Sequence, residues 1–406
     1  MDMSQIEALA KRANDASEMR DVFYGGLLDQ EDTQVTYSTE DVFRAFRSYP
    51  NKRSVRNELK ELKEAGHKLN KLANNHFALT HDEVQWLAER RDEPAYEFRH
   101  KPAFVAVIKN LKGGVGKSTT TCNLADYLVL SPAEIASRKR VLIIDLDPQG
   151  SCTFHYLKRF DTEMYISAIT LMSLPADEIS KELIRDNSIQ KTWINGLDIM
   201  PCSTDEGFVA DTLYDVASEQ NIAIHELLRE KVIKHIENDY DFILIDCGPH
   251  MDAVMKATIG AVDGMFLPTT PKSIDFDSTL KFIERWPEMY TGMVNDGYDM
   301  SQLKFIKSFI NMGNDSTSVK SSVYNDSAVD DLEKIFREDY IQCSLIEHEV
   351  HTRCMAFSKT VVSMSSTAFK KHVGERMAFV DRRSEVYAWG KQLTSIMVNE
   401  HAKIGE

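Results

Sequence analysis

The feature that most constrains this chain is a glycine-rich loop between an apolar run and a helical pattern. The apolar run is Phe104-Val105-Ala106-Val107-Ile108, and the loop is Lys112-Gly113-Gly114-Val115-Gly116-Lys117-Ser118. Glycines let backbone N–H groups curve around phosphate oxygens, and the N-terminus of the following helix adds free donors and partial positive charge. This order of strand, loop and helix predicts a phosphate site in an α/β fold.

The chain from residue 103 onward continues the same alternation of apolar runs and helical patterns. We expect strands at 104–108, 141–145, 242–246, 263–268 and 304–311, and a helix at 117–130. Continuous apolar runs are typical of parallel strands that are covered on both faces. The predicted fold class is therefore α/β, with a mostly parallel P-loop sheet flanked by helices.

Acidic residues follow two of the predicted strands. Asp145 and Asp147 come at the end of one strand, and Asp246 ends another. Ligands of open α/β sheets bind at the carboxyl ends of the strands, where carboxylates can hold Mg²⁺ or orient a water. A single aspartate at such a place is also a common helix cap or turn residue. The three together, behind a phosphate loop, favour the nucleotide site.

These motifs resemble those of the ParA/MinD superfamily of P-loop ATPases. The two-lysine loop is similar to their deviant Walker A motif, in which Leu111 stands where the strict pattern has its first glycine. The segment from Asp145 to Gln149 resembles their Walker A′ motif, and 243–246 their Walker B motif. The long N-terminal region resembles that of the larger, type Ia ParA proteins of plasmid and chromosome partition. The resemblance implies ATP, ADP and Mg²⁺ as ligands.

The resemblance also implies a role for individual residues. Lys112 would reach the nucleotide of a partner subunit, Lys117 would bind the phosphates in its own subunit, and Asp147 would position the attacking water. Ser118, Asp145 and Asp246 would hold the metal. The expected ATP-binding residues are Lys112, Gly113, Gly114, Val115, Gly116, Lys117, Ser118, Thr119 and Asn311. Asn311 would contact adenine, although asparagine is equally typical of a turn at this place.

The first hundred residues differ in pattern from the rest. We expect three parts: an N-terminal helix and linker at 1–35, a winged helix-turn-helix DNA-binding domain at 36–102, and a ParA-type P-loop ATPase domain at 103–406. The helix at 4–20 would support dimerisation or pack on its own domain. The second part begins with a helix capped at Ser38, followed by a helix from Ser54 to Ala65, a hairpin at 67–79, a helix at 82–90 and a polar linker at 91–102.

Residues 44–71 carry nine Lys and Arg against three Glu, whereas the whole chain has a net charge of −15. Recognition helices present arginine, asparagine and lysine near their N-termini to DNA. The expected contacts in this helix are Arg53, Arg56, Asn57 and Lys60. The alternative is a solvated helix whose glutamates pair with its basic residues.

A second basic patch lies near the C-terminus. Its candidate DNA contacts are Arg353, Lys359, Lys370, Lys371 and Arg376. No aromatic residues suited to base stacking interleave with them, so the chemistry is that of phosphate contact without sequence readout. The alternative is a set of exposed charged helix faces. The resemblance implies binding to nonspecific double-stranded DNA in this half.

Other features bear on location. No apolar run approaches about 20 residues, so no membrane-spanning helix is expected. The N-terminus has no signal-peptide pattern, and the six cysteines form no CxxC pair. The final amphipathic stretch at 376–404 has a mixed polar face, which favours core packing over a membrane surface. We expect a cytoplasmic, nucleoid-associated protein without a membrane partner.

The resemblance implies an ATP-dependent DNA-partition ATPase. Its ATP-bound homodimer would bind nonspecific DNA, as filaments in some members, and leave on hydrolysis stimulated by a ParB-type centromere-binding protein. The ADP form would bind operator DNA and repress its own operon. The alternatives are a MinD-like positioning ATPase for another cargo, a nucleotide-sensing transcriptional repressor, and a metabolic P-loop enzyme.

Overall fold

The computed structural model describes residues 3–27, 34–72, 74–157, 165–249, 252–313 and 319–405, with backbone alone for 20–27 and 319–325. Within these residues, eight strands form one sheet in the order β10-β9-β8-β3-β7-β4-β6-β5. All neighbours are parallel except the pair of β5 and β6. The strands are β3 (Phe104–Ile108), β4 (Val141–Asp145), β5 (Gln190–Lys191), β6 (Leu197–Met200), β7 (Phe242–Asp246), β8 (Gly264–Thr269), β9 (Phe305–Gly313) and β10 (Leu345–Ile346).

The five predicted strands are confirmed to within two residues at each end. The short strands β5, β6 and β10 were not predicted, because runs of two to four residues carry little periodic signal. The three strands that carry the phosphate loop and the acidic ends, β3, β7 and β4, lie side by side in the middle of the sheet. The predicted α/β class with a mostly parallel sheet is confirmed.

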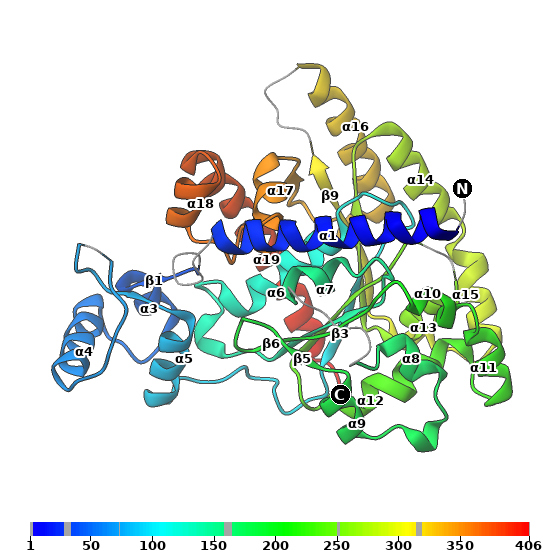
Figure 1. Ribbon diagram of the computed structural model, residues 1–406, viewed down its shortest axis with the longest axis horizontal. Helices are drawn as coiled ribbons and strands as arrows, with labels where there is room; N and C mark the ends of the chain where they lie inside the picture. The colour runs from blue at the N-terminus through cyan, green and yellow to red at the C-terminus, as the bar shows by residue number, and fades with distance from the viewer. Residues whose placement is uncertain are drawn as a thin grey trace.

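Helices cover both faces of the sheet (Figure 1). The helices of the chain are α1 (Met3–Leu27), α3 (Thr39–Ala45), α4 (Lys52–Glu64), α5 (His81–Arg90), α6 (Lys117–Leu130), α7 (Ser151–Tyr156), α8 (Ala168–Ser173), α9 (Lys181–Asn187), α10 (Glu206–Ala210), α11 (Leu213–Glu219), α12 (Lys234–Ile236), α13 (Ala253–Ala261), α14 (Ser273–Glu284), α15 (Trp286–Asn295), α16 (Val319–Phe336), α17 (Glu349–Met355), α18 (Ser366–His372) and α19 (Arg376–His401).

Alternate residues of β3 belong to two different hydrophobic cores. Phe104, Ala106 and Ile108 pack in the core that contains α6 and α19. Val105 and Val107 pack in the core that contains α8, α13 and α14. Because both faces of β3 are buried, every position of the strand must be apolar. Helix α19 is thus a core helix, as the mixed charge of its polar face predicted, with Trp389 fully buried.

The N-terminal region folds in the predicted order of helix, helix, hairpin and helix. Ser38 caps α3 in a capping box with Asp41. The second helix, α4, begins at Lys52 and not at Ser54, because the side chain of Asn51 accepts the Ser54 N–H and is the cap. A bridge between Lys71 and Phe77 closes the hairpin, and the strand β1 (Tyr37–Ser38) pairs with β2 (Ala78–Leu79).

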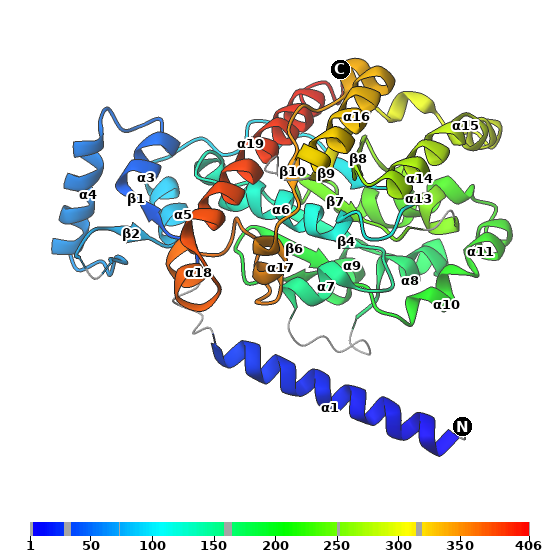
Figure 2. The same ribbon diagram turned by 90° about the horizontal axis from the view of Figure 1, so that it is seen from above.

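This region packs against the P-loop part of the chain. The Tyr37 hydroxyl donates to the Leu130 carbonyl oxygen at 2.7 Å, and the Gln85 amide donates to the Ile135 carbonyl oxygen at 3.0 Å. Buried side chains from Val35 to Met397 form one continuous core across position 102. By contrast, α1 is drawn apart from this body in Figure 2, and its Ile6 and Leu9 side chains are exposed.

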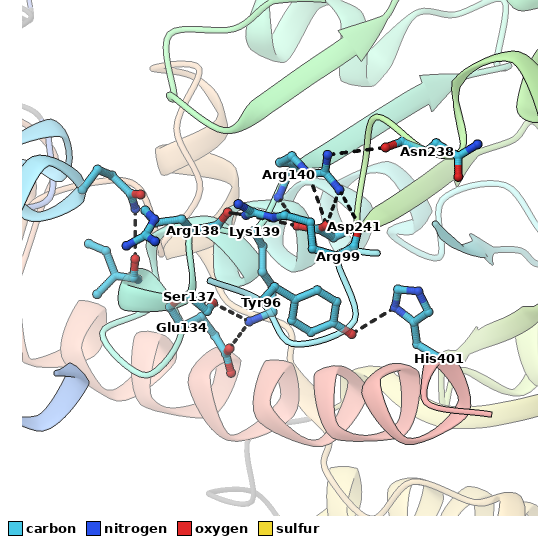
Figure 3. Close-up of polar contacts among 12 residues, drawn as sticks. Tyr96, Arg99, Glu134, Ser137, Arg138, Lys139, Arg140, Asn238, Asp241 and His401 are labelled. Atoms are coloured by element: carbon cyan, nitrogen blue, oxygen red, sulfur yellow. Dashed lines mark hydrogen bonds and ion pairs between the residues drawn. The ribbon is translucent and has the colours of Figure 1, made fainter. Parts of the chain in front are cut away.

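The segment at 91–102, predicted as a polar linker, is anchored instead (Figure 3). The Tyr96 hydroxyl lies 3.0 Å from Nδ1 of His401, whose Nε2 lies 2.9 Å from the Pro102 carbonyl oxygen. Arg99 and Arg140 both pair with Asp241, at 3.5 Å and 2.7 Å. Tyr96 and Arg99 are therefore fixed by partners distant in sequence, a feature that composition does not reveal.

The Asp241 carboxylate is fully buried and also accepts the Arg140 N–H at 2.8 Å. We expect Asp241→Asn to lower the free energy of unfolding by about 2–3 kcal/mol, because a buried acceptor loses its charge beside two guanidinium groups. Asp239→Asn, two residues away, removes a carboxylate that pairs with Lys181 and Arg185 in partly exposed contacts, and it should cost less than about 1 kcal/mol. Urea unfolding measures both variants, and equal losses would contradict this ranking.

Candidate nucleotide site

The phosphate loop lies at the carboxyl edge of the sheet, between the end of β3 and the start of α6. Gly116 is the N-cap of α6 and has a φ of 78°. A cavity of about 710 Å³ opens in front of the loop. It is lined by Gly113, Gly114, Gly116, Lys117, Ser118, Thr119, Thr120, Asn123, Asp147, Gln149, Ser151, Pro249, Asn311, Met312 and the segment 345–349 with His351, Thr352 and Met355. The predicted phosphate-binding glycines thus share one cavity with Asp147, whereas Asp145 and Asp246 are not among its lining residues.

The two lysines of the loop are placed differently. Lys117 is buried at the cavity, and its Nζ donates to the Lys112 carbonyl oxygen at 3.1 Å. Burial lowers the pKa of Lys117, and the nearby Lys109 lowers it further. The Lys112 side chain is not among the cavity-lining groups, and its Nζ pairs with Asp275 of α14 at 3.2 Å. Of the two, only Lys117 lines the cavity, which is the position that the predicted role in phosphate binding requires.

The three aspartates have distinct surroundings. Asp147 is partly exposed and lines the cavity. Both oxygens of Asp145 are occupied: Oδ1 accepts the Asp147 N–H at 3.2 Å, and Oδ2 accepts the backbone N–H and the hydroxyl of Thr153 at 2.9 and 2.8 Å. Burial raises the pKa of Asp145, and the charge of Asp246 adds to the rise. Asp145, predicted to help hold the metal, instead uses both oxygens to fix the backbone from 145 to 153, and its metal role stays a prediction.

Asp246 has a free oxygen. Its Oδ2 accepts a hydrogen bond from the Cys152 thiol at 3.3 Å, whereas its Oδ1 is buried without a hydrogen-bond partner. Burial raises the pKa of Asp246 to about 6, and the neighbouring Ser118 hydroxyl lowers it in part. An unpartnered buried carboxylate oxygen beside a hydroxyl fits Mg²⁺ or one of its waters. Among the described residues, no group of three or more His, Cys, Asp or Glu side chains is placed to hold a metal ion.

Asn311, predicted as an adenine contact, faces the loop at the edge of the cavity. Its amide donates to the Val115 carbonyl oxygen at 2.7 Å and to the Thr120 hydroxyl at 3.3 Å. A Cβ atom on Gly116 would lie 2.7 Å from this amide nitrogen. Asn311 therefore supports the phosphate loop, and the adenine contact stays a prediction.

The cavity wall opposite the loop was missed by sequence reasoning. It is formed by β10 and the start of α17, including Glu347, His348 and His351. These residues lie more than 200 positions after the loop, and their sequence has no glycine motif or apolar run that marks a ligand site. Only the pairing of β10 with β9 brings them to the cavity.

The four predicted DNA contacts in α4 share one exposed side. Arg53, Arg56, Asn57 and Lys60 are exposed, whereas Val55, Leu59 and Leu62 of the same helix are buried. The helix is therefore amphipathic, and its basic face is available at the surface. The expected pairing of Glu58 within the helix is absent, because Glu58 pairs with Arg91 of the following segment.

The C-terminal candidates separate into two groups. Lys370, Lys371 and Arg376 are exposed on α18 and at the start of α19. Arg353 is exposed but pairs with Glu349 at 2.9 Å and donates to the Val373 carbonyl oxygen at 3.0 Å. Lys359 does not fit the predicted DNA surface, because it is buried with its Nζ 3.0 Å from the centre of the Trp193 ring. Charge in a sequence does not tell which lysines fold inward.

The space around Gly116 yields a test of the loop geometry. Gly116→Ala should lower the melting temperature and weaken nucleotide affinity at least about tenfold, because it adds backbone strain at positive φ and a clash with Asn311. In the double variant with Asn311→Ala the clash is removed, so the loss should be smaller than the sum of the two single losses. Thermal melting and titration with a fluorescent ATP analogue measure both quantities. If the loss in the double variant equalled the sum of the two single losses, the proposed clash between residue 116 and Asn311 would be contradicted.

The sequence and the fold were compared with known proteins. Residues 103–293 match the AAA domain family. The chain is 34% identical over 225 residues to plasmid partition protein A of Escherichia coli, covering 54% of this chain and 56% of that protein. It is 31% identical over 167 residues to the chromosome partitioning protein ParA of Caulobacter vibrioides, covering 41% and 56%. The chain thus spans a little over half the length of these curated relatives.

Solved structures extend the likeness. A structure described as a partition protein matches 92% of this chain and all of its own, with a TM-score of 0.65 and 26% identity. Cyanothece McdA in complex with ATP matches 75% of this chain with a TM-score of 0.54 and 17% identity, which shows a shared fold. No helix in the described part of the chain is long and apolar enough to cross a bilayer. Through its P-loop sequence and the fold around it, the chain resembles the ParA proteins of the ParA/MinD superfamily of ATPases.

Proposed function

We propose that the protein is a Mg²⁺-dependent ATPase that segregates DNA, as a plasmid or chromosome partition protein. The observation that carries this proposal is the cavity at the end of β3, where Lys117 and the glycines of the loop share one space with Asp147, while Asp246 Oδ1 is buried without a hydrogen-bond partner at the end of neighbouring β7. A site built only to sense a nucleotide would not need a carboxylate in the position of Asp147. The partition proteins to which the chain is similar support the cellular role.

The residues divide the chemistry as follows. Lys117 and the N–H groups from Gly113 to Thr119 hold the β- and γ-phosphates, where they neutralise charge that develops during phosphoryl transfer. Ser118 and Asp246 would hold Mg²⁺, which would supply positive charge to neutralise the bound phosphates. Asp145 fixes the turn that carries Asp147. Asp147 orients a water for attack on the γ-phosphorus.

The proposed active form is a homodimer with ATP between its subunits. Each subunit would contribute Lys112 to the phosphates bound by the other, so the γ-phosphate decides whether the interface is complete. Hydrolysis then weakens the interface, as in other nucleotide switches that order and release contacts. A ParB-type centromere-binding protein would accelerate this step, and the dimer would leave the DNA.

Two DNA surfaces serve different states in this proposal. The ATP dimer would bind nonspecific double-stranded DNA through Lys370, Lys371, Arg376 and Arg353, and could extend along it as a filament. In the ADP form, the region at 36–102 would act as a winged helix-turn-helix and bind operator DNA through Arg53, Arg56, Asn57 and Lys60. Support comes from the exposed basic face of α4 and the hairpin that follows it. The protein would accordingly be cytoplasmic and nucleoid-associated.

Asp147→Ala separates hydrolysis from binding. The variant should lose ATP turnover by about 100-fold or more, because the attacking water loses its orienting carboxylate, while ATP affinity changes less than about threefold. Phosphate release and titration with a fluorescent ATP analogue measure the two properties. Glu219→Ala, at an exposed position on α11, is a control for the loss of one carboxylate. Unchanged turnover in Asp147→Ala would favour a nucleotide-sensing repressor over a partition ATPase.

Each of the two basic surfaces should be needed for DNA binding in one nucleotide state and not in the other. Arg53→Ala with Arg56→Ala should abolish operator binding in ADP and leave ATP-dependent binding to random duplex DNA intact. Lys370→Ala with Lys371→Ala should have the opposite effect and make the salt dependence of random-duplex binding shallower by up to about two in log–log slope. Fluorescence anisotropy across a salt series, without nucleotide and with ADP or ATP–Mg²⁺, measures both. If the affinity for random duplex DNA were the same without nucleotide, with ADP and with ATP–Mg²⁺, the proposed control of DNA binding by ATP would be refuted.

A further inference from the structure

The side chain of Lys112 lies outside the cavity that its own loop forms. Its Nζ is 3.2 Å from Oδ1 of Asp275, near the start of α14, and the two side chains are 35% and 22% exposed. Lys117, the other lysine of the loop, lines the cavity. Of the two positive charges of the loop, Lys117 thus faces the cavity, whereas Lys112 is held by the Asp275 carboxylate of α14.

Asp275 is itself held in place by its surroundings. Its Oδ2 accepts the Thr270 hydroxyl at 3.3 Å, and its carbonyl oxygen accepts the Thr279 hydroxyl at 3.1 Å. The Asn110 amide donates to the same Thr279 hydroxyl at 2.9 Å, and Asn110 Oδ1 accepts the Lys112 N–H at 3.0 Å. A closed set of contacts therefore joins the start of the phosphate loop to the first turns of α14, with the Lys112–Asp275 pair as its most exposed member.

We propose that Asp275 is a positioning residue that holds Lys112 away from nucleotide in the free subunit, and that release of this ion pair accompanies ATP-driven dimerisation. The inference rests on the proposed function, in which Lys112 serves the nucleotide of the partner subunit. The Lys112 ammonium has three N–H donors, but its Nζ is held 3.2 Å from a carboxylate of its own subunit, so in this proposal the side chain leaves Asp275 to reach a phosphate across an interface. Each subunit must therefore break one ion pair before the dimer is complete.

The exposure of the pair suits a reversible contact. Partly exposed ion pairs contribute little to stability, so a competing anion can displace them. The γ-phosphate of ATP offers more charge and more acceptor oxygens than one carboxylate, whereas ADP lacks that group. The pair would thus favour free or ADP-bound monomers and yield to ATP. The neighbouring pair of Lys272 with Glu347 at 2.9 Å ties the same end of α14 to the cavity wall.

The first test measures the contact without relying on activity. The full-length protein, free of nucleotide, is exposed briefly to an amine-acetylating reagent, and the labelling rate of Lys112 is compared by mass spectrometry with that of exposed Lys281 on α14. Asp275→Asn should raise the Lys112 rate about two- to fivefold relative to Lys281, the range expected for an exposed ion pair. Asp275→Glu, which keeps the charge, should restore a rate near that of the wild type. Equal rates in wild type and Asp275→Asn would overturn the proposal.

Asp277→Asn is the matched control, because Asp277 is an exposed carboxylate on the same helix, two residues from Asp275. It should leave the labelling rate of Lys112 unchanged. If it raises the rate as much as Asp275→Asn does, the effect is one of general charge and the proposal fails. Melting temperatures of the three variants show whether each is folded.

The second test measures the consequence for assembly. Analytical ultracentrifugation in ATP–Mg²⁺ should show that Asp275→Asn dimerises at a lower protein concentration than the wild type. The decrease should be about two- to fivefold for each of the two Lys112–Asp275 pairs that a dimer loses. Neither protein should associate in ADP. A fall in both dimerisation and ATP turnover would mean that Asp275 orients Lys112 productively, which overturns the proposal. If no variant associates in ATP although the labelling rates differ, the proposed function is refuted and the pair has no nucleotide role. Lack of ATP binding in the wild type would separately refute the nucleotide site.

Discussion

The burial of β3 on both faces and both edges is the constraint on which the rest of the structure depends. The strand lies between β7 and β8, with one core on each face, so it cannot shift without exposing apolar side chains to water. Its carboxyl end therefore has one position in space. The phosphate loop leaves the sheet there, and β4 and β7 bring Asp145 and Asp246 to the same edge in register.

Because this edge of the sheet is rigid, it can hold buried carboxylates in positions that are electrostatically unfavourable. Two buried carboxylates lie side by side, and burial raises the pKa of both; the charge of Asp246 adds to the rise at Asp145, and the charge of Asp147 adds to the rise at Asp246. Asp145 is compensated by three hydrogen bonds, whereas Asp246 keeps one oxygen without a partner. A flexible loop would relax to satisfy that oxygen. The packed strand keeps that oxygen buried in a residue that neighbours Ser118, and the proposed Mg²⁺ site uses this pair of residues.

The N-terminal region packs directly against the helix that begins at the phosphate loop. The helices of residues 36–102 share one core with α6, the helix that begins at the phosphate loop. The Tyr37 hydroxyl bonds to Leu130 at the other end of that same helix. A change at the phosphate loop that moves α6 would thus reach the α3–α4 region through direct contacts. The anchored segment at 91–102 provides a second connection, through Asp241 and His401.

The sequence alone determined the fold class, the five main strands and the phosphate loop, because each depends on local pattern: apolar runs, glycines at fixed spacing and aspartates at strand ends. Only the tertiary structure decided which side chains meet. It turned Lys359 inward onto Trp193, occupied both oxygens of Asp145, and brought the 345–355 segment to the cavity. It also paired Lys112 with Asp275, 163 positions away. Residue type and spacing fix what a side chain can do, whereas long-range packing fixes what it touches.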